Sequence, residues 1–377
     1  MESITGYTLR ELRDKVSQLG MESYRANQIL RWIYKKKVTD FELMTDLPRN
    51  YRLHLREIFS VCSLKLIKSV EAPSAVKYLF KTKDDHLIET VLIKERDHLT
   101  LCVSSQIGCA VGCKFCATAL DGLKRNLKTE EIVDQFLQVQ LTLKEHIRNV
   151  VFMGMGEPLA NYDNVRKAVE IMISPWGFDL SKRRVTLSTS GLLKPLCKMR
   201  RDPLLKEINL AVSINAPFQE LREEIMPLSE KNDLEELMKI LREFPLPKYR
   251  RITLEYVLIK DLNDSPSMAK ALADLIGKSV KRFKVNLIPY NPDPFLPYER
   301  PSLDRIMEFQ RILWSKGIST FVRFSKGVEV FGACGQLRHN RNMLKSHFHE
   351  SYSQMANGVS IDNCCSSLYK SNPGSSF

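Results

Sequence analysis

Hydrophobic positions in the first 60 residues follow a helical period. Apolar residues recur three and four positions apart in three segments, at 8–20, 23–37 and 51–59. The first segment opens with a T-x-x-E capping box made by Thr8 and Glu11, and Gly20 is placed to end the helix. Residues 1–60 are therefore predicted to form a compact helical module.

The hydrophobic pattern then changes twice. Residues 61–97 alternate apolar and polar positions in the runs SLKLIKSV, AVKYLFKT and HLIETVLIK, which predicts a small antiparallel β extension or linker. From residue 98 to 340, short apolar runs alternate with amphipathic segments such as TEEIVDQFLQVQLTL. Six runs are predicted strands: LTLCVSS, NVVFMG, RRVTLST, EINLAVSI, ITLEYVLI and RFKVNLIPY.

Repeated strand–helix units indicate an α/β fold in which a parallel sheet curves into a partial (β/α)6 barrel. The active site of such a barrel is expected at the C-terminal ends of its strands. Residues 341–377 are polar and aperiodic, so we expect a disordered C-terminal tail.

Composition narrows the class of protein. The chain has 377 residues, 44% hydrophobic and 27% charged, and carries neither an export signal nor an apolar run of the roughly 20 residues that span a bilayer. We expect a cytoplasmic monomer with no membrane partner. The net charge of +13 favours a polyanionic partner such as RNA, most clearly at 181–206, where Asp202 is the single acid. A solvated helix face is the alternative explanation of that run.

Three cysteines, Cys109, Cys113 and Cys116, follow the first predicted barrel strand closely. Three thiolates can hold three irons of a 4Fe–4S cluster and leave the fourth iron open to a substrate. A structural zinc site needs a fourth ligand, for which Cys102 is the candidate, although it lies within an apolar strand. Nine cysteines in a chain without export features indicate thiols or metal ligands more than structural disulfides.

The C-x-x-x-C-x-x-C motif resembles that of the radical S-adenosylmethionine (SAM) superfamily, and MGMGEP at 153–158 resembles its glycine-rich loop. Together, LCVSSQIGCAVGCKFCATA, GMGEPLANYDNV, RRVTLSTSG, LIPYNP and ACGQL resemble the RlmN family of dual-specificity RNA adenine methyltransferases. This resemblance extends from the helical module to about residue 340.

The resemblance implies a role for each matching residue. The three cysteines named above would bind the cluster, and the residues implied to contact SAM are Gly156, Glu157, Ser188, Ser213, Ile214, Asn215 and Asn291. Cys334 would carry the methyl group, Cys102 would release the product through a transient disulfide with Cys334, and Glu89 would accept the ring proton. Without the resemblance, Cys334 would be interpreted as a small buried residue.

The resemblance also implies partners and a product. Two SAM molecules and two electrons, supplied by a donor such as flavodoxin, would form 2-methyladenine in 23S ribosomal RNA and also in transfer RNA. The alternatives are a Cfr-type enzyme that modifies adenine C8, and a non-catalytic RNA-binding protein with a metal site. Pro158 after the glycine-rich loop favours the RlmN form over the Cfr type.

Two segments depart from the family pattern. Asn215 stands where the family usually has His, and Asn cannot titrate as His does. The run Lys326–Val330 before Cys334 differs from the usual Arg-Gly-x-Asp-Ile type. Both departures bear on efficiency and on the choice of RNA more than on the reaction type.

Overall fold

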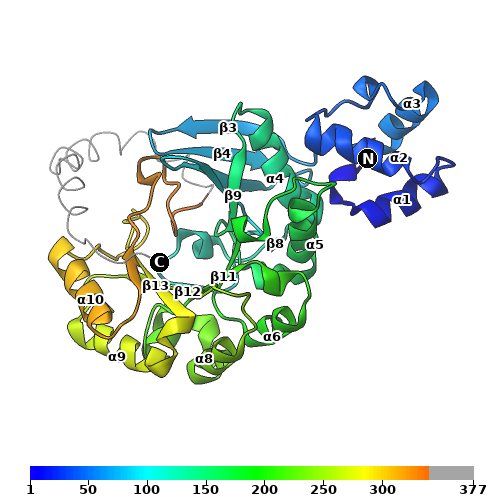
Figure 1. The fold of residues 1–377 in the computed structure, drawn as a ribbon. Coiled ribbons are helices and arrows are strands. Elements are labelled where there is room, and N and C mark those ends of the chain that lie inside the picture. Colours follow the sequence, from blue (N-terminus) through cyan, green and yellow to red (C-terminus); the bar gives the residue numbers. More distant parts are fainter. Residues whose placement is uncertain (339–377) are drawn as a thin grey trace. The chain divides into compact units, whose positions relative to one another are not determined.

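One ten-stranded sheet organises the computed structural model, which describes residues 1–338 (Figure 1). Its parallel part has the order β6-β9-β10-β11-β12-β13-β14. The bounds are β6 (Leu99–Cys102), β9 (Ile147–Phe152), β10 (Val185–Thr189), β11 (Asn209–Ser213), β12 (Ile252–Leu258), β13 (Phe283–Pro289) and β14 (Thr320–Val322). The predicted α/β fold and its six barrel strands are confirmed, and β14 adds a strand that the hydrophobic pattern does not predict. The predicted tail at 341–377 lies outside the described residues.

Helices cover the outer face of the curved sheet (Figure 1). They are α4 (Thr129–Leu141), α5 (Tyr162–Ile173), α6 (Leu193–Arg201), α7 (Gln219–Ile225), α8 (Leu234–Glu243), α9 (Pro266–Ile276) and α10 (Leu303–Ser315). Alternate strand residues such as Phe152, Leu187 and Val212 are fully buried beneath these helices. Their neighbours in the sequence, including Val151, Thr186 and Ser188, are only partly buried and face the barrel interior.

The predicted β extension continues the barrel sheet. It consists of β3 (Lys65–Glu71), β4 (Ala75–Lys81) and β5 (Leu87–Lys94), which are antiparallel to one another. Strand β5 pairs antiparallel with β6, with Val91 opposite Cys102. The segment after β14 reaches back to this extension: Lys326 Nζ donates to the Lys94 carbonyl at 2.7 Å, and Gly327 N donates to Ser74 Oγ at 3.1 Å.

The N-terminal helices are α1 (Leu9–Gln18), α2 (Arg25–Leu30), which continues into a π-turn, and α3 (Arg49–Ile58). The predicted capping box is confirmed, because Glu11 N donates to Thr8 Oγ1 and Thr8 N donates to Glu11 Oε2. Short strands β1 (Glu2–Ser3) and β2 (Phe59–Ser60) pair in parallel.

This helical module shares its hydrophobic core with the barrel. The rings of Tyr34 and Phe178 are 4.7 Å apart, and Lys167 of α5 pairs with Glu11 at 2.8 Å. Residues 1–338 form a single compact unit, so the predicted boundaries near 60 and 97 separate segments of that unit. None of its helices is long and apolar enough to cross a bilayer.

Candidate functional site

The three cysteines lie on a loop that a short β ladder closes. Strand β7 (Gln106–Ile107) precedes the loop and pairs antiparallel with β8 (Arg125–Asn126), which follows it. Gly108 begins the loop at a φ of +73°, and a Cβ there would lie 1.8 Å from the Gly122 carbonyl oxygen. Only glycine fits this close approach, so Gly108 and the ladder together define the width of the loop.

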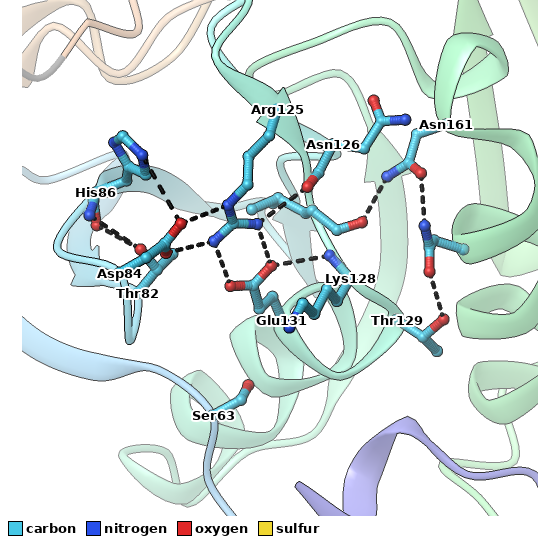
Figure 2. Close-up of polar contacts among 12 residues, drawn as sticks. Ser63, Thr82, Asp84, His86, Arg125, Asn126, Lys128, Thr129, Glu131 and Asn161 are labelled. Carbon is cyan, nitrogen blue, oxygen red and sulfur yellow. Dashed lines mark hydrogen bonds and ion pairs between the residues drawn. The ribbon is translucent and has the colours of Figure 1, made fainter. Parts of the chain in front are cut away.

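An ion-pair network anchors β8 to its surroundings (Figure 2). The Arg125 guanidinium donates to both oxygens of Asp84 at 2.7 and 2.6 Å and to both oxygens of Glu131 at 2.8 Å. Glu131 also accepts the Lys128 N–H at the start of α4. Arg125 holds the pKa of the Asp84 carboxyl well below its usual range. The network therefore ties the end of the cysteine loop to the β4–β5 turn and to α4.

The cysteine sulfurs lie in an apolar environment. Val111, Phe115, Ile225, Met226 and Tyr290 are among the buried residues that surround them. Burial raises the pKa of the Cys109 thiol to about 12 and raises the pKa values of the other two thiols as well.

A buried cation lies beside these thiols. Arg222 of α7 is fully buried, and its Nη2 donates to the Ser190 carbonyl at 2.6 Å. Burial lowers the pKa of Arg222 to about 10, whereas the nearby Cys113 acts in the opposite direction. Three thiols, an apolar shell and an adjacent cation suit an anionic iron–sulfur cluster, whose properties depend on such burial and charge.

Cys102 does not complete a four-cysteine set with this loop. It ends β6 inside the barrel and lines the same cavity as Cys334. Within residues 1–338, no three His, Cys, Asp or Glu side chains are arranged to hold a single metal ion.

The GMGEP loop follows β9 and depends on Gly156. A Cβ at Gly156 would lie 2.4 Å from Gln106 Cβ, and its φ is +99°. The side-chain Oε1 of Gln106 accepts the Glu157 N–H at 2.7 Å, so a side chain of β7 supports the loop directly. The buried Glu157 carboxylate accepts N–H groups of Leu159 and Ser190 at 3.0 and 2.7 Å. Burial nevertheless raises the pKa of Glu157.

The next two strands bring further predicted site residues to the same edge. Ser188 lies near the end of β10, and Ser213 ends β11; both are partly buried. Ile214 is fully buried and donates its N–H to the Glu255 carbonyl at 2.9 Å. These residues share the C-terminal edge of the parallel strands with the GMGEP loop and the cysteine loop.

The Asn215 side chain forms hydrogen bonds within the protein. Asn215 has a φ of +59°, a conformation that Asn tolerates better than most residues. Its Oδ1 accepts the Val257 N–H at 2.9 Å, and its backbone carbonyl accepts from Asn263 Nδ2 at 2.8 Å. The Asn that departs from the family pattern thus fixes the end of β12, and its side chain is buried.

Asn291, two residues beyond β13, holds the segment that carries Cys334. Asn291 Nδ2 donates to the Cys334 carbonyl at 3.1 Å and to Ser325 Oγ at 2.9 Å. From the cysteine loop, Ala117 N donates to the Gly335 carbonyl at 2.7 Å. The methyl-carrying candidate is therefore attached to both the cysteine loop and the SAM-facing edge.

Cys334 and Cys102 face a common cavity of about 520 Å³ within the barrel. Cys334 is exposed to this cavity, whereas Cys102 is buried in its strand, and both are free thiols. Enclosure in the barrel raises the pKa of Cys334, and the Glu255 carboxylate adds to the effect. Burial and the neighbouring Cys334 likewise raise the pKa of Cys102.

The predicted proton acceptor Glu89 lies on β5 beside the Cys334 segment. Its carboxylate pairs with Lys77 Nζ at 3.0 Å and accepts the Arg338 N–H at 2.9 Å. Ser104, just after β6, donates its hydroxyl to the Glu89 carbonyl at 2.6 Å. Glu89 is thus held by contacts with three different segments, and it is not among the residues that line the cavity shared by the two thiols.

Three residues of this site are not predicted from the sequence. Gln106 supports the GMGEP loop, Arg222 lies beside the cysteines, and Glu255 lines the thiol cavity. Glu255 offers the one usable signal, because an acid interrupts the apolar strand ITLEYVLI. Gln106 and Arg222 lie in ordinary polar contexts and carry no comparable signal.

The sequence matches two known protein families. Residues 3–61 match the ribosomal RNA large subunit methyltransferase N-terminal domain, and residues 103–275 match the radical SAM superfamily.

Individual relatives match over nearly their whole length. The probable dual-specificity RNA methyltransferase RlmN of Aquifex aeolicus is 68% identical over 346 residues, which is 92% of this chain and 99% of the relative. The RlmN enzyme of Syntrophobacter fumaroxidans is 45% identical, covering 89% and 97%. The crystal structure of a radical SAM methyltransferase from Sphaerobacter thermophilus is 40% identical, with a TM-score of 0.85 over 90% of this chain and 99% of that one.

Proposed function

Because this chain belongs to the RlmN family of radical SAM RNA methyltransferases, we propose that it forms 2-methyladenine in 23S ribosomal RNA and in transfer RNA. The enzyme class and its cofactors, a 4Fe–4S cluster and SAM, follow from family membership. The methylated product and the two classes of RNA substrate are proposals that go beyond family membership. The observation that carries the proposal is the shared cavity of Cys102 and Cys334, since RNA binding alone requires neither thiol.

When bound, the cluster and SAM would supply a carbon radical able to remove hydrogen from an S-methyl group. Such chemistry is needed because adenine C2 is electron-poor and cannot attack the methyl group of SAM. Cys109, Cys113 and Cys116 would hold the cluster. Gly156, Glu157, Ser188, Ser213, Ile214 and Asn291 would contact SAM, as would the Asn215 backbone, because the Asn215 side chain is already bonded within the protein.

Cys334 and Cys102 act in different steps of the proposed methyl transfer. Cys334 takes a methyl group from the first SAM, a substitution that suits a soft sulfur nucleophile. After hydrogen removal, the Cys334 methylene would join the adenine ring, Glu89 would accept the ring proton, and the unpaired electron left on the ring adduct would return to the bound cluster. Cys102 would then attack the Cys334 sulfur. A sulfur–sulfur bond forms, the bond between the Cys334 sulfur and the methylene carbon breaks, and that carbon takes up a proton, which releases the methylated RNA and leaves a protein disulfide. The β5–β6 register supports these roles in part, because it places Val91, two residues along β5 from Glu89, opposite Cys102.

The partners follow the same reasoning. We propose that a donor such as flavodoxin supplies the electrons and that the enzyme acts as a cytoplasmic monomer. The helical module would help to hold folded RNA, because it carries 11 Lys and Arg against 8 Asp and Glu and matches an rRNA-methyltransferase domain.

The two-thiol mechanism is tested by Cys102→Ala and Cys334→Ala. We expect the Cys102 variant to load its methyl group and attack the base but to stall, which leaves RNA covalently attached through Cys334. The Cys334 variant has no atom to carry the methylene, so it should form no adduct. A denaturing gel after incubation with RNA, SAM and reductant separates these outcomes.

Cys197→Ala is a matched control, because Cys197 is a free thiol on α6 outside the cavity. It should turn over as the unmodified chain does. Multiple turnovers by Cys102→Ala without a shifted band would contradict the mechanism. Mass spectrometry of adenosine from the treated RNA then distinguishes 2-methyladenine from the C8 product.

A further inference from the structure

One face of the β extension carries a row of side chains that leads to Cys102. Lys77 of β4 lies opposite Val91 of β5, and Val91 lies opposite Cys102 of β6. Residues directly opposite one another in a sheet point to the same face, so these three side chains share one face. Glu89 is two residues along β5 from Val91 and therefore points to this face as well. Lys77, Glu89 and Cys102 are thus neighbours on one surface of the sheet.

The Cys334 segment (residues 326–338) lies against this face. A Cβ added to Gly332 would lie 3.4 Å from Val91 Cγ1, which is ordinary packing distance. Beyond Cys334, the Arg338 N–H donates to Glu89 Oε2 at 2.9 Å. The segment is therefore attached to β5 on both sides of its cysteine.

Lys77 contacts both the predicted proton acceptor and the segment. Its Nζ lies 3.0 Å from Glu89 Oε1 and donates to the Phe331 carbonyl at 3.5 Å. The side chains of Lys77 and Glu89 are enclosed, with exposed fractions of 13% and 5%. Water screens an enclosed ion pair little, so removal of one partner would leave a buried charge unpaired. Lys77 therefore holds Glu89 and the Cys334 segment in one arrangement.

The Glu89 carboxylate is the centre of this arrangement. One of its oxygens faces Lys77 on β4, and the other accepts the N–H of Arg338. The Arg338 guanidinium is held in turn by Asp121, which follows the cysteine loop, through two bonds of 3.0 and 2.9 Å. The charged groups that face Glu89 thus come from β4 and from the Cys334 segment.

Protonation of Glu89 would weaken both of its bonds. Each carboxylate oxygen has a second lone pair, so Glu89 can accept a proton while it holds Lys77 and Arg338. Hydrogen bonds to an ionised group are roughly twice as strong as those between neutral groups. A neutral Glu89 would also leave the enclosed Lys77 ammonium without a counter-charge. In the proposed reaction, Glu89 becomes neutral when it accepts the ring proton.

The backbone of the segment favours its movement once these bonds weaken. Phe331 has a φ of +49°, a left-handed conformation that is unfavourable for an aromatic residue. Such a conformation persists only while surrounding contacts hold it, and the bond from Lys77 is one of those contacts. Gly335, directly after Cys334, has a φ of +82° that glycine adopts without strain.

We propose that Lys77 is a positioning residue of the methyl transfer. Together with Glu89 it forms a latch that holds the Cys334 segment on the β extension while the methylene joins the adenine ring. The ring proton that Glu89 accepts then opens this latch, and the segment moves before Cys102 attacks. The proposal rests on the proposed function, because that function supplies the proton. The C–H bond of the ring breaks and an O–H bond forms on Glu89, so no further reactant is needed.

Hydrogen–deuterium exchange of the anaerobic holoenzyme tests the latch without RNA or turnover. We expect Lys77→Met and Glu89→Gln each to raise exchange in the Cys334 segment about tenfold, since each removes one charged partner. Lys77→Arg keeps the charge and should restore protection. Lys81→Met is the matched control, because Lys81 lies on the same strand but pairs with Asp85 at 2.6 Å in the β4–β5 turn. Unchanged exchange in either Lys77→Met or Glu89→Gln would overturn the latch.

Rates of the separate steps test the role of Lys77 in methyl transfer. In the Cys102→Ala background, we expect Lys77→Met to slow covalent adduct formation about tenfold at unchanged iron content and RNA affinity. With Cys102 present, the adduct that forms should decay at least as fast as in the parent, because the segment is no longer held. Lys77→Arg should restore adduct formation.

Equal slowing of adduct formation and adduct decay by Lys77→Met would show that Lys77 only supports the fold, and it would overturn the positioning role. Adduct formation at the parent rate would overturn it as well. If the parent itself forms no adduct, the proposed function fails, and the exchange rates still decide whether Lys77 and Glu89 hold the Cys334 segment.

Discussion

Gly156 shows how one residue shapes the site. Its φ of +99° lies in a region that residues with a side chain rarely adopt, and its missing Cβ leaves room for Gln106. Gln106 uses that proximity to accept the Glu157 N–H. The backbone geometry of the GMGEP loop thus depends on a contact made by a residue 50 positions earlier in the chain.

Gly156→Ala should disable this loop. The added methyl would meet Gln106 Cβ at 2.4 Å, so either the loop or β7 must shift. We expect SAM affinity to fall at least tenfold with iron content unchanged, measured by anaerobic calorimetric titration. Gly20→Ala is the control, because Gly20 has a φ of +75° but no atom within 4 Å of an added Cβ. It should lower the free energy of unfolding only by the backbone penalty of about 1–2 kcal/mol and leave SAM affinity unchanged. SAM binding by Gly156→Ala equal to that of the unmodified chain would contradict this account.

At this scale the sequence predicts residues that belong to motifs and misses residues that act through contacts. The cysteine spacing and the GMGEP run are contiguous, so local order in the sequence identifies them. Arg222 is different, because only folding brings α7 beside Cys113. The engagement of the Asn215 side chain is equally invisible in the sequence, since its bond to Val257 joins distant segments.

At the scale of elements, α4 connects the barrel to the helical module. Asp134 of α4 is fully buried, and its Oδ2 accepts the N–H groups of Ser63 and Leu64, each at 2.7 Å, and Gln138 Nε2 at 2.8 Å. Burial outweighs these bonds and raises the pKa of Asp134 to about 6. The link between the module and β3 therefore depends on a carboxyl that resists ionisation.

Asp134→Asn should stabilise the protein at high pH. The folded pKa of Asp134 exceeds its ordinary value of 3.8, so its favourable contribution is complete below pH 4 and is lost as pH rises through 6. The neutral amide avoids that loss, and its oxygen can accept the same N–H groups. We expect the free energy of unfolding to rise by about 1–3 kcal/mol at pH 8 and to change little at pH 4.

Urea unfolding at the two pH values measures this difference. Asp14→Asn removes a charge from an exposed position of α1 and serves as the control. A gain that is the same at pH 4 and pH 8 would show that Asp134 ionisation is not its cause.

Elements differ in how well the sequence predicts them. The amphipathic helices, the six barrel strands and the three strands of the β extension are predicted, because each lies in an apolar run long enough to display a pattern. Strand β14 has only Thr320, Phe321 and Val322, too few for a pattern to be recognised. The pairing of β5 with β6 is likewise invisible in the sequence, because alternation identifies a strand but not its neighbour in the sheet. The β extension is therefore predicted as separate, although it continues the barrel sheet.

At the scale of the whole molecule, the positive charge is concentrated in more than one stretch of the chain. The run 181–206, with Asp202 as its single acid, is one such stretch, and the end of the second module helix is another. There Lys36 and Lys37 follow Lys35, and Lys36 Nζ lies 3.2 Å above the Trp32 ring. Lys35 is partly neutralised by Asp179 at 3.6 Å, which leaves Lys36 and Lys37 as the better candidates for phosphate contact.

Lys36→Glu with Lys37→Glu should weaken RNA binding without altering Cys334 methylation. Two lost phosphate contacts would make the slope of log affinity against log salt less steep by roughly 1.4 to 1.8 and lower affinity about tenfold at 0.1 M salt. If one RNA contacts both the module and the run 181–206, combining this pair with Arg183→Glu should add the two losses, since separated sites behave independently. Filter binding over a salt series measures both quantities. An unchanged slope in the lysine pair would remove the module from the RNA interface and leave the run 181–206 as the remaining basic stretch.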